Sequence, residues 1–157
     1  MYISFFFRTF ARSIYMNAMS PDIETLKQLV FPLIGTCQEV HKILGPFLNE
    51  YMYQDAMAIE LNIRNIPFQK EFLFNANYKG YVIEHKHYVD FLVRNGETDI
   101  LLECKAVDNL VDAHRQQLWN YMRLTGINIG VLYNFAPVYA KCEKYFYDSA
   151  SARMIAF

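Results

Sequence analysis

Apolar residues at helical spacing dominate the chain after residue 20. From Ser20-Pro21-Asp22 they recur at steps of three and four, which predicts an amphipathic helix that ends at Gly45-Pro46. Its apolar positions are Leu26, Leu29, Val30, Leu33, Cys37, Val40 and Leu44. Pro32 inside this pattern predicts a kink or a later start. A second helix is predicted over residues 48–64, and its predicted buried stripe is Leu48, Met52, Ala56, Ile59 and Ile63.

Strand patterns follow in the middle of the chain. Residues 67–78 and 81–94 are rich in Tyr, Phe and Val, and NYKG between them predicts a hairpin turn. A second turn, NGET at residues 95–98, leads into DILLECKAV. These segments predict three antiparallel strands.

A crossover helix and a buried strand are predicted next. Residues 109–124 read as a helix with Gly126 as its C-terminal cap, and the apolar run INIGVLYNF at residues 127–135 is typical of a buried strand. A strand, a helix and another buried strand imply a right-handed parallel connection. The predicted fold is therefore mixed α/β, with helices against a mixed central sheet and an edge strand near residues 144–147.

Composition indicates one globular domain. The 157 residues are 54% hydrophobic and 20% charged, enough for a packed core without a covalent staple. The formal net charge of -1 excludes an overall basic field, so any surface that binds phosphate must be local. Three widely spaced cysteines without a CxxC pair, Cys37, Cys104 and Cys142, predict reduced core residues in a cytoplasmic protein.

Residues 1–20 differ from the rest because they contain no acidic group and a run of Phe too short to cross a bilayer. The segment lacks the positive start of a signal peptide, since no Lys or Arg precedes this run, and Arg8 interrupts the apolar region. Three interpretations compete: a membrane-surface or targeting segment, an appended amphipathic helix, or translated sequence upstream of a true start at Met19. The helical pattern begins just after Met19, which favours the last. We therefore expect a non-core leader at residues 1–20, a single domain at residues 21–157, and no association with a membrane.

Charged residues interrupt the apolar strands in the stretch HKHYVDFLVRNGETDILLECKAV. Charged side chains are rarely buried unless they are paired or bind a metal. Alternation along a strand puts Asp90 on the face opposite Val89 and Phe91, and it puts Glu103 and Lys105 together on one face. Something must compensate these charges if the strands are buried.

The predicted register suggests what compensates them. If Arg94 pairs with Asp99 across the NGET loop, Asp90 lies opposite Glu103, and two facing carboxylates repel unless a cation joins them. This predicts Asp90 and Glu103 as oxygen ligands of Mg²⁺ or Mn²⁺, with Lys105 beside them, a site suited to phosphodiester hydrolysis. The alternative is a Lys105 salt bridge on a solvated face of the strand.

The pattern D(x)12-E-x-K after a hairpin resembles the core of the PD-(D/E)XK nuclease superfamily. More closely, IGTCQEVHKILGPFLNEYMYQDAMAIEL, VDFLV, LLECKAV and HRQQLWNYMRLTGINIGVLYNF resemble the small bacterial GxxExxR family within it. The resemblance covers about residues 24–136 and implies a restriction-endonuclease-like αβββαβ core that acts on nucleic acid. Phe47 and Tyr53 stand where the family's naming motif has Gly and Arg.

The resemblance also implies further site residues. Glu50, on the helix before the sheet, matches a third metal-site carboxylate, although the helix dipole also favours a Glu in a first turn. Gln117 and Tyr121 match a Gln and a Tyr four residues apart in the family. Gln117 is then expected to reach the metal site or a phosphate while Tyr121 packs beside it. A partly buried polar edge of a core helix is the alternative.

Together these features predict a metal-dependent nuclease. In this hypothesis Asp90 and Glu103 bind Mg²⁺ and Glu50 completes or supports the shell. Lys105 orients or activates water and Gln117 positions it. By analogy with the family, action as a homodimer or with a partner is expected, and the sequence does not choose between DNA and RNA.

Two other functions compete with this prediction. One is a catalytically inactive nuclease-like module in nucleic-acid or protein interaction, favoured by the near-neutral charge and by aromatic residues expected at the surface, such as Tyr51, Tyr53 and Tyr139. The other is a small-molecule phosphate hydrolase, which needs a closed pocket. His85 and His87 form an HxH pattern, but two ligands are too few to indicate zinc.

Overall fold

The computed structural model describes residues 21–157, so the expectations for residues 1–20, including a start at Met19, lie outside it. The helices are α2 (Ile23–Leu44), α3 (Glu50–Ile63) and α4 (Asp112–Thr125). The strands are β1 (Phe68–Tyr78), β2 (Tyr81–Asn95), β3 (Thr98–Lys105), β4 (Ile129–Asn134), β5 (Lys141–Asp148) and β6 (Arg153–Ala156).

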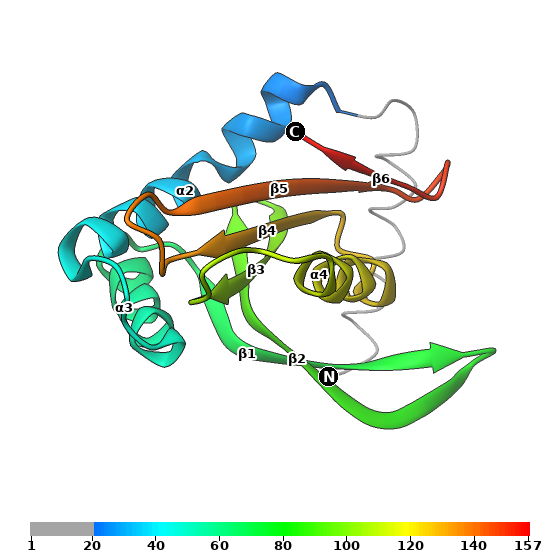
Figure 1. Ribbon diagram of the computed structural model, residues 1–157. Coiled ribbons are helices and arrows are strands. Elements are labelled where there is room, and N and C mark those ends of the chain that lie inside the picture. The colour runs from blue at the N-terminus through cyan, green and yellow to red at the C-terminus, as the bar shows by residue number, and fades with distance from the viewer. Residues whose placement is uncertain (1–20) are drawn as a thin grey trace.

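The strands form one six-stranded sheet in the order β1-β2-β3-β4-β5-β6. Strands β3 and β4 pair in parallel, and the other neighbours pair antiparallel. Helices α2 and α3 cover one face of the sheet, and α4, the crossover between β3 and β4, covers the other (Figure 1). The predicted mixed α/β fold is confirmed, and its αβββαβ core runs from α3 to β4.

Strand β6 was not predicted. The expected edge strand at residues 144–147 falls inside β5, and β6 forms the edge on that side of the sheet. The sequence of β6, RMIA, does not alternate polar and apolar residues, so it shows no strand pattern. None of the helices within residues 21–157 has both the length and the hydropathy that crossing a bilayer requires.

Helix α2 begins where the sequence places a cap. The carboxylate of Asp22 accepts the backbone N–H of Thr25 at 2.9 Å, which satisfies an N–H that the first turn leaves free. The helix continues through Pro32 to Leu44, so the alternative of a start at Pro32 is wrong. It ends at Gly45, whose φ of 75° is a conformation that favours glycine.

The buried face of α3 is not the predicted one. The side chains that are fully buried on α3 are Tyr53, Met57 and Leu61. Members of the predicted stripe are exposed instead, with 40% of Met52, 62% of Ile59 and 67% of Ile63 accessible. Glu50 precedes Tyr53 by three residues and therefore shares its helical face. With this face of α3 buried, Glu50 is directed toward the sheet.

Tyr53 decides the orientation of α3. Its hydroxyl donates to the carbonyl of Gly45 at 2.8 Å and accepts the N–H of Leu48 at 3.1 Å. Its ring stacks on Phe135 of the segment after β4, with ring centroids 4.7 Å apart. A large aromatic side chain whose polar atom is satisfied gains more from burial than Met52 does. The expectation of a surface aromatic at Tyr53 is therefore wrong.

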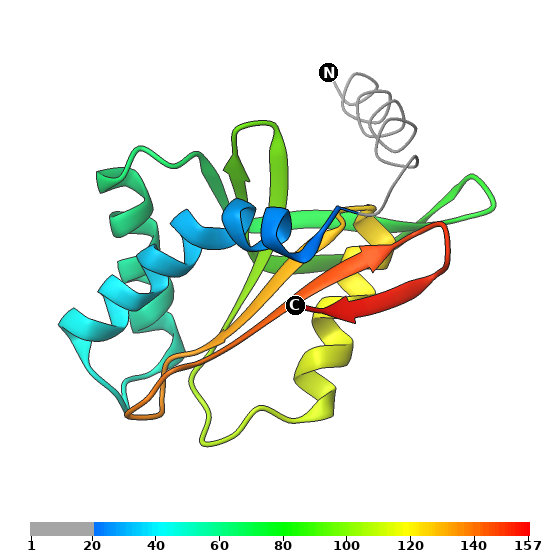
Figure 2. The same ribbon diagram turned by 90° about the horizontal axis from the view of Figure 1, so that it is seen from above.

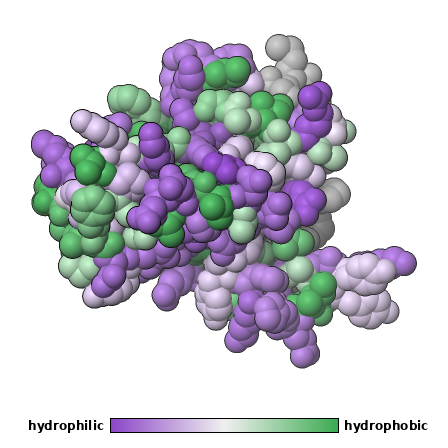
Figure 3. All heavy atoms as spheres, in the orientation of Figure 1, coloured by the Kyte–Doolittle hydropathy of each residue, from purple (hydrophilic) through white to green (hydrophobic). Residues whose placement is uncertain are grey.

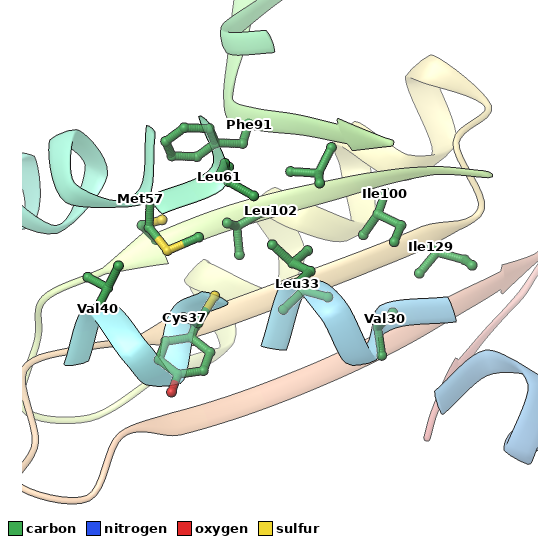
Figure 4. Packing of buried hydrophobic residues seen from close by; sticks show 14 of the residues in the cluster. Val30, Leu33, Cys37, Val40, Met57, Leu61, Phe91, Ile100, Leu102 and Ile129 are labelled. Atoms are coloured by element: carbon green, nitrogen blue, oxygen red, sulfur yellow. The ribbon is translucent and has the colours of Figure 1, made fainter. Parts of the chain in front are cut away.

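Apolar clusters fill both sides of the sheet. The larger lies between the sheet and helices α2 and α3, where Leu33, Met57 and Leu102 meet (Figure 4). The smaller lies under α4 and includes Leu101 and Leu118. Strand β3 is buried on both faces over residues 100–104. Any charge near the end of β3 is therefore inside the molecule.

Strands β1 and β2 bend together at Glu71 and Asp90. Glu71 has a φ of 51°, a left-handed conformation that costs roughly 1–2 kcal/mol for a residue with a Cβ. Val89 packs in the cluster under α4, whereas Phe91 packs in the cluster under α2 and α3. The prediction that Val89 and Phe91 share one face is therefore wrong, because the bend resets the alternation at Asp90.

Candidate active site

The β2–β3 hairpin brings Asp90 and Glu103 together. Its register pairs Arg94 with Asp99, as predicted, and the backbone ladder continues to Phe91 opposite Leu102. The next positions along the two strands are Asp90 and Glu103, which the described ladder does not include. Asp90 and Glu103 therefore follow directly on the last backbone pair of the two strands.

Each carboxylate accepts a backbone N–H from the opposite strand. The N–H of Cys104 donates to Asp90 Oδ2 at 2.8 Å, and the N–H of Asp90 donates to Glu103 Oε1 at 3.4 Å. The bend in β2 permits the first bond because it directs the Asp90 side chain toward β3 rather than toward a face of the sheet. The two acids are thus fixed by backbone.

Lys105 completes a buried charged group. Its Nζ lies 3.1 Å from Glu103 Oε2, and the side chains of Lys105 and Glu103 are only 12% and 3% exposed. The salt bridge of the alternative interpretation exists, but it is not on a solvated face. A buried ion pair usually gives little net stability, because desolvation offsets the attraction. Function is therefore a better explanation for these residues than stability.

Burial raises the pKa of both acids, and repulsion by Asp90 adds to the shift of Glu103. Burial, together with the charge of Asp90, raises the pKa of Glu103 to about 7, against the opposing effect of Lys105. Burial also raises the pKa of Asp90, although the Cys104 N–H and the Lys105 charge oppose the shift. At neutral pH the pair therefore carries negative charge at a cost that a cation would relieve.

Lys105 stays protonated at neutral pH. Burial alone would lower its pKa, but the charges of Glu103, Glu50 and Asp90 outweigh burial and raise the pKa above its usual value. The ammonium is thus a hydrogen-bond donor and a positive charge in this site, and not a base.

Helix α3 contributes Glu50 and Gln54. Burial and the charge of Asp90 raise the pKa of Glu50, while Lys105 lowers it, so all three charges act on one another. The Gln54 amide lies 3.4 Å from Glu50 Oε1, and a hydrogen bond from the same side chain lowers the pKa of Asp90. Sequence reasoning missed Gln54, because the predicted stripe of α3 put the wrong face of the helix toward the sheet.

Gln117 and Tyr121 form a pair on α4. Gln117 Nε2 donates to the Tyr121 hydroxyl at 3.1 Å, and the Tyr121 ring stands edge-on to Phe74 of β1 at 5.2 Å. The described hydrogen bond of Gln117 thus goes to Tyr121 and not to the carboxylates. The pair joins α4 to the β1–β2 hairpin.

Asn134 holds the loop that follows Lys105. Its side chain accepts the N–H of Val107 at 3.1 Å and donates to the Val107 carbonyl at 2.7 Å. The N–H of Phe135 donates to the Lys105 carbonyl at 2.8 Å. Sequence reasoning missed Asn134 as well. A polar residue at the end of the apolar run INIGVLYNF could have indicated it.

The donor set fits a divalent ion at an open site. Within residues 21–157 no three or more His, Cys, Asp or Glu side chains are grouped so that they could hold a metal ion. The predicted set of Glu50, Asp90 and Glu103 is therefore not a closed cage. Mg²⁺ commonly takes one or two carboxylates and completes its shell with water and substrate phosphate. Asp90 and Glu103 suit such a site, and the charges of Lys105 and Asp90 act on nearby Glu50.

Comparison with known proteins gives one family. Residues 27–145 match the sequence model described as the PD-(D/E)XK nuclease superfamily. No curated protein matches the chain. A solved structure described as "Crystal structure of SSO0001" aligns with a TM-score of 0.45 and 18% identity, covering 90% of this chain and 65% of that chain. The present chain thus spans slightly less than two thirds of that protein's length.

Proposed function

Since the chain belongs to the PD-(D/E)XK nuclease superfamily, we propose that it is a metal-dependent nuclease whose reaction centre is Asp90, Glu103 and Lys105. The observation that carries this proposal is the buried group itself. Two acids and a lysine are held by backbone hydrogen bonds and one ion pair at the end of a strand that is otherwise apolar. The narrower likeness to the GxxExxR family stays a prediction.

In the proposed mechanism the two acids and Lys105 have different roles. Mg²⁺ or Mn²⁺, when bound, would polarise the phosphodiester and lower the pKa of water. In their ionised forms, Asp90 and Glu103 would hold the cation. The Lys105 ammonium donates to a phosphate oxygen or to the attacking water and stabilises the charge that develops on phosphorus oxygens. Its raised pKa favours orientation of water over proton abstraction.

Supporting residues fix this geometry. The Gln54 amide orients Asp90 and Glu50, and Glu50 offers a further acceptor at the edge of the site. We propose that Gln117 contacts substrate phosphate through the second N–H of its amide, since the first donates to Tyr121 and its described hydrogen bond does not go to the carboxylates. Tyr121 supports Gln117.

The test is cleavage of labelled single-stranded and double-stranded DNA and RNA with Mg²⁺, with Mn²⁺ and with EDTA. Cleavage is expected with either metal and not with EDTA. Asp90→Asn and Glu103→Gln should each lose roughly 100-fold or more. Glu24→Gln, an exposed acid in the first turn of α2, is the matched control and should keep full activity. Equal cleavage rates in wild type, Asp90→Asn and Glu103→Gln would contradict the proposal.

A second candidate is an interaction module without turnover. Tyr51 and Tyr139 are 59% and 82% exposed, as that alternative expects. Nucleic-acid binding without cleavage under all these conditions would favour it. For the compartment, we propose the cytoplasm, because the described cysteines are all free thiols, Cys37, Cys104 and Cys142.

A further inference from the structure

The β1–β2 hairpin beyond the bend, residues 72–89 and called the arm from here on, projects from the body of the molecule (Figures 1 and 2). Tyr78 and Tyr81 face each other across its tip and are 62% and 78% exposed, and Tyr88 is 52% exposed. These large rings bury little within the described chain. Exposed aromatic side chains gathered on one element commonly mark a binding surface.

The arm combines these rings with positive charge. Between residues 72 and 89 it contains Lys79 and Lys86, and its single acidic residue is Glu84. Lys79 Nζ lies 5.4 Å from the centre of the Tyr78 ring. In the space-filling view the projecting arm is mostly purple and pale (Figure 3). The arm also exposes three apolar side chains, Leu73, Val82 and Ile83. Its exposed rings and lysines suit a partner that carries both flat rings and negative charge.

The arm is anchored at its base and leads to the reaction centre. Phe74 and Ala76 are 9% and 5% exposed, and Phe74 packs edge-on against Tyr121 of α4 at 5.2 Å. The His87 ring lies 5.4 Å from Phe74. Strand β2 runs from the tip directly to Asp90, nine residues after Tyr81, or roughly 30 Å of extended strand. An extended ligand bound along the arm would therefore reach the carboxylates of Asp90 and Glu103.

We propose that the arm binds a single-stranded segment of nucleic acid, with bases stacked on Tyr78 and Tyr81 and phosphates on Lys79 and Lys86. A base can stack on a tyrosine ring only if one of its faces is free. In a duplex the neighbouring bases cover these faces. Lys79, which lies against the Tyr78 ring, complements the phosphate of a stacked base, and Lys86, further along β2 toward Asp90, is available for a phosphate nearer the reaction centre. This inference rests on the proposed nuclease function, which places the bound nucleic acid at Asp90 and Glu103. It makes single-stranded nucleic acid the class of substrate for that reaction centre.

The test is fluorescence anisotropy with a labelled 15-nucleotide DNA and the matching RNA, in EDTA so that nothing is cleaved. The double variant Tyr78→Ala with Tyr81→Ala should bind at least roughly tenfold more weakly, since each stacked base contributes on the order of that factor. The double variant Lys79→Ala with Lys86→Ala should show a smaller salt dependence of binding. Phe31→Ala, a matched exposed aromatic residue on α2, should bind like wild type.

The arm proposal is overturned if the wild type does not bind, if the tyrosine variant binds within twofold of wild type, or if a blunt hairpin duplex binds better than the single strand. Circular dichroism and thermal unfolding check that the variants fold. Cleavage assays on the same proteins separate the two proposals. Binding through the arm without metal-dependent cleavage refutes the nuclease alone. Cleavage that needs Asp90, together with binding that ignores the arm, refutes the arm alone.

Discussion

The carboxylates of Asp90 and Glu103 each accept a backbone N–H from the opposite strand, Asp90 from Cys104 at 2.8 Å and Glu103 from Asp90 itself at 3.4 Å. Such bonds fix both side chains without removing their charge. The protein therefore holds two carboxylates together, with Glu103 buried and Asp90 half-buried. A preorganised site of this kind binds a cation without a further ordering step.

Cation binding should therefore stabilise the fold. At pH 7.5, raising Mg²⁺ to about 100 times its dissociation constant should add about 2.7 kcal/mol to the free energy of unfolding. Thermal unfolding in a Mg²⁺ titration measures this, and EDTA should reverse it. Asp90→Asn should lose the effect and Glu24→Gln should keep it. An equal shift in Asp90→Asn would place the cation elsewhere.

Without metal, the protein should lose stability as pH rises from about 4.5 to 7. The pKa of Glu103 rises from 4.5 to about 7 on folding, so the folded state holds more protons than the unfolded state in this window, and the free energy of unfolding falls with pH. The full effect of Glu103 is roughly 3 kcal/mol. Asp90 acts in the same direction, since its pKa is also raised. Urea unfolding in EDTA at pH 5 and pH 7.5 measures the difference.

Glu103→Gln isolates this contribution, because it keeps the shape and removes the charge. It should raise the stability of the metal-free protein at pH 7.5 and flatten the pH dependence. Glu143→Gln is an opposite control. The bond from Arg115 holds the pKa of Glu143 below its usual value, so this ion pair stabilises the fold and its loss should destabilise. If the free energy of unfolding of Glu103→Gln falls with pH as steeply as that of wild type, Glu103 is not the cause of the pH dependence.

Lys105→Met should separate catalysis from metal binding. The ammonium acts on phosphate or water in the proposed mechanism, so its loss should lower cleavage by roughly 100-fold while leaving both acids in place. Calorimetry should still detect Mg²⁺ binding, and tighter binding is expected because the competing positive charge is gone. Lys42→Met, on the surface of α2, is the control. Loss of metal binding in Lys105→Met would show that the lysine only supports the acids.

The sequence predicted this hairpin well because its determinants are local. The NGET loop and the pairing of Arg94 with Asp99 set the register, and from that register the approach of Asp90 to Glu103 follows. Side-chain direction at Asp90 was not predictable, because the bend depends on the left-handed Glu71 in the partner strand. Glu71 lies nineteen positions away, and its pattern shows nothing unusual.

Helix α3 shows a different limit. Its sequence carries two apolar stripes, one through Met52, Ile59 and Ile63 and the other through Tyr53, Met57 and Leu61. Periodicity alone cannot choose between stripes of similar strength. The choice depends on Phe135, which stacks on Tyr53 from a segment 82 residues later. Gln54 and the inward place of Glu50 were hidden by the same ambiguity.

The orientation of α3 is itself testable by paired substitutions on its two stripes. Met57→Ala empties a fully buried position and should cost about 2–5 kcal/mol of stability. Ile59→Ala, two residues later on the exposed stripe, should change stability by less than about 0.5 kcal/mol. Urea unfolding of both variants gives the comparison. If the larger loss falls on Ile59→Ala, the predicted stripe faces the sheet after all, and Glu50 and Gln54 then point away from Asp90, which would remove α3 from the proposed site.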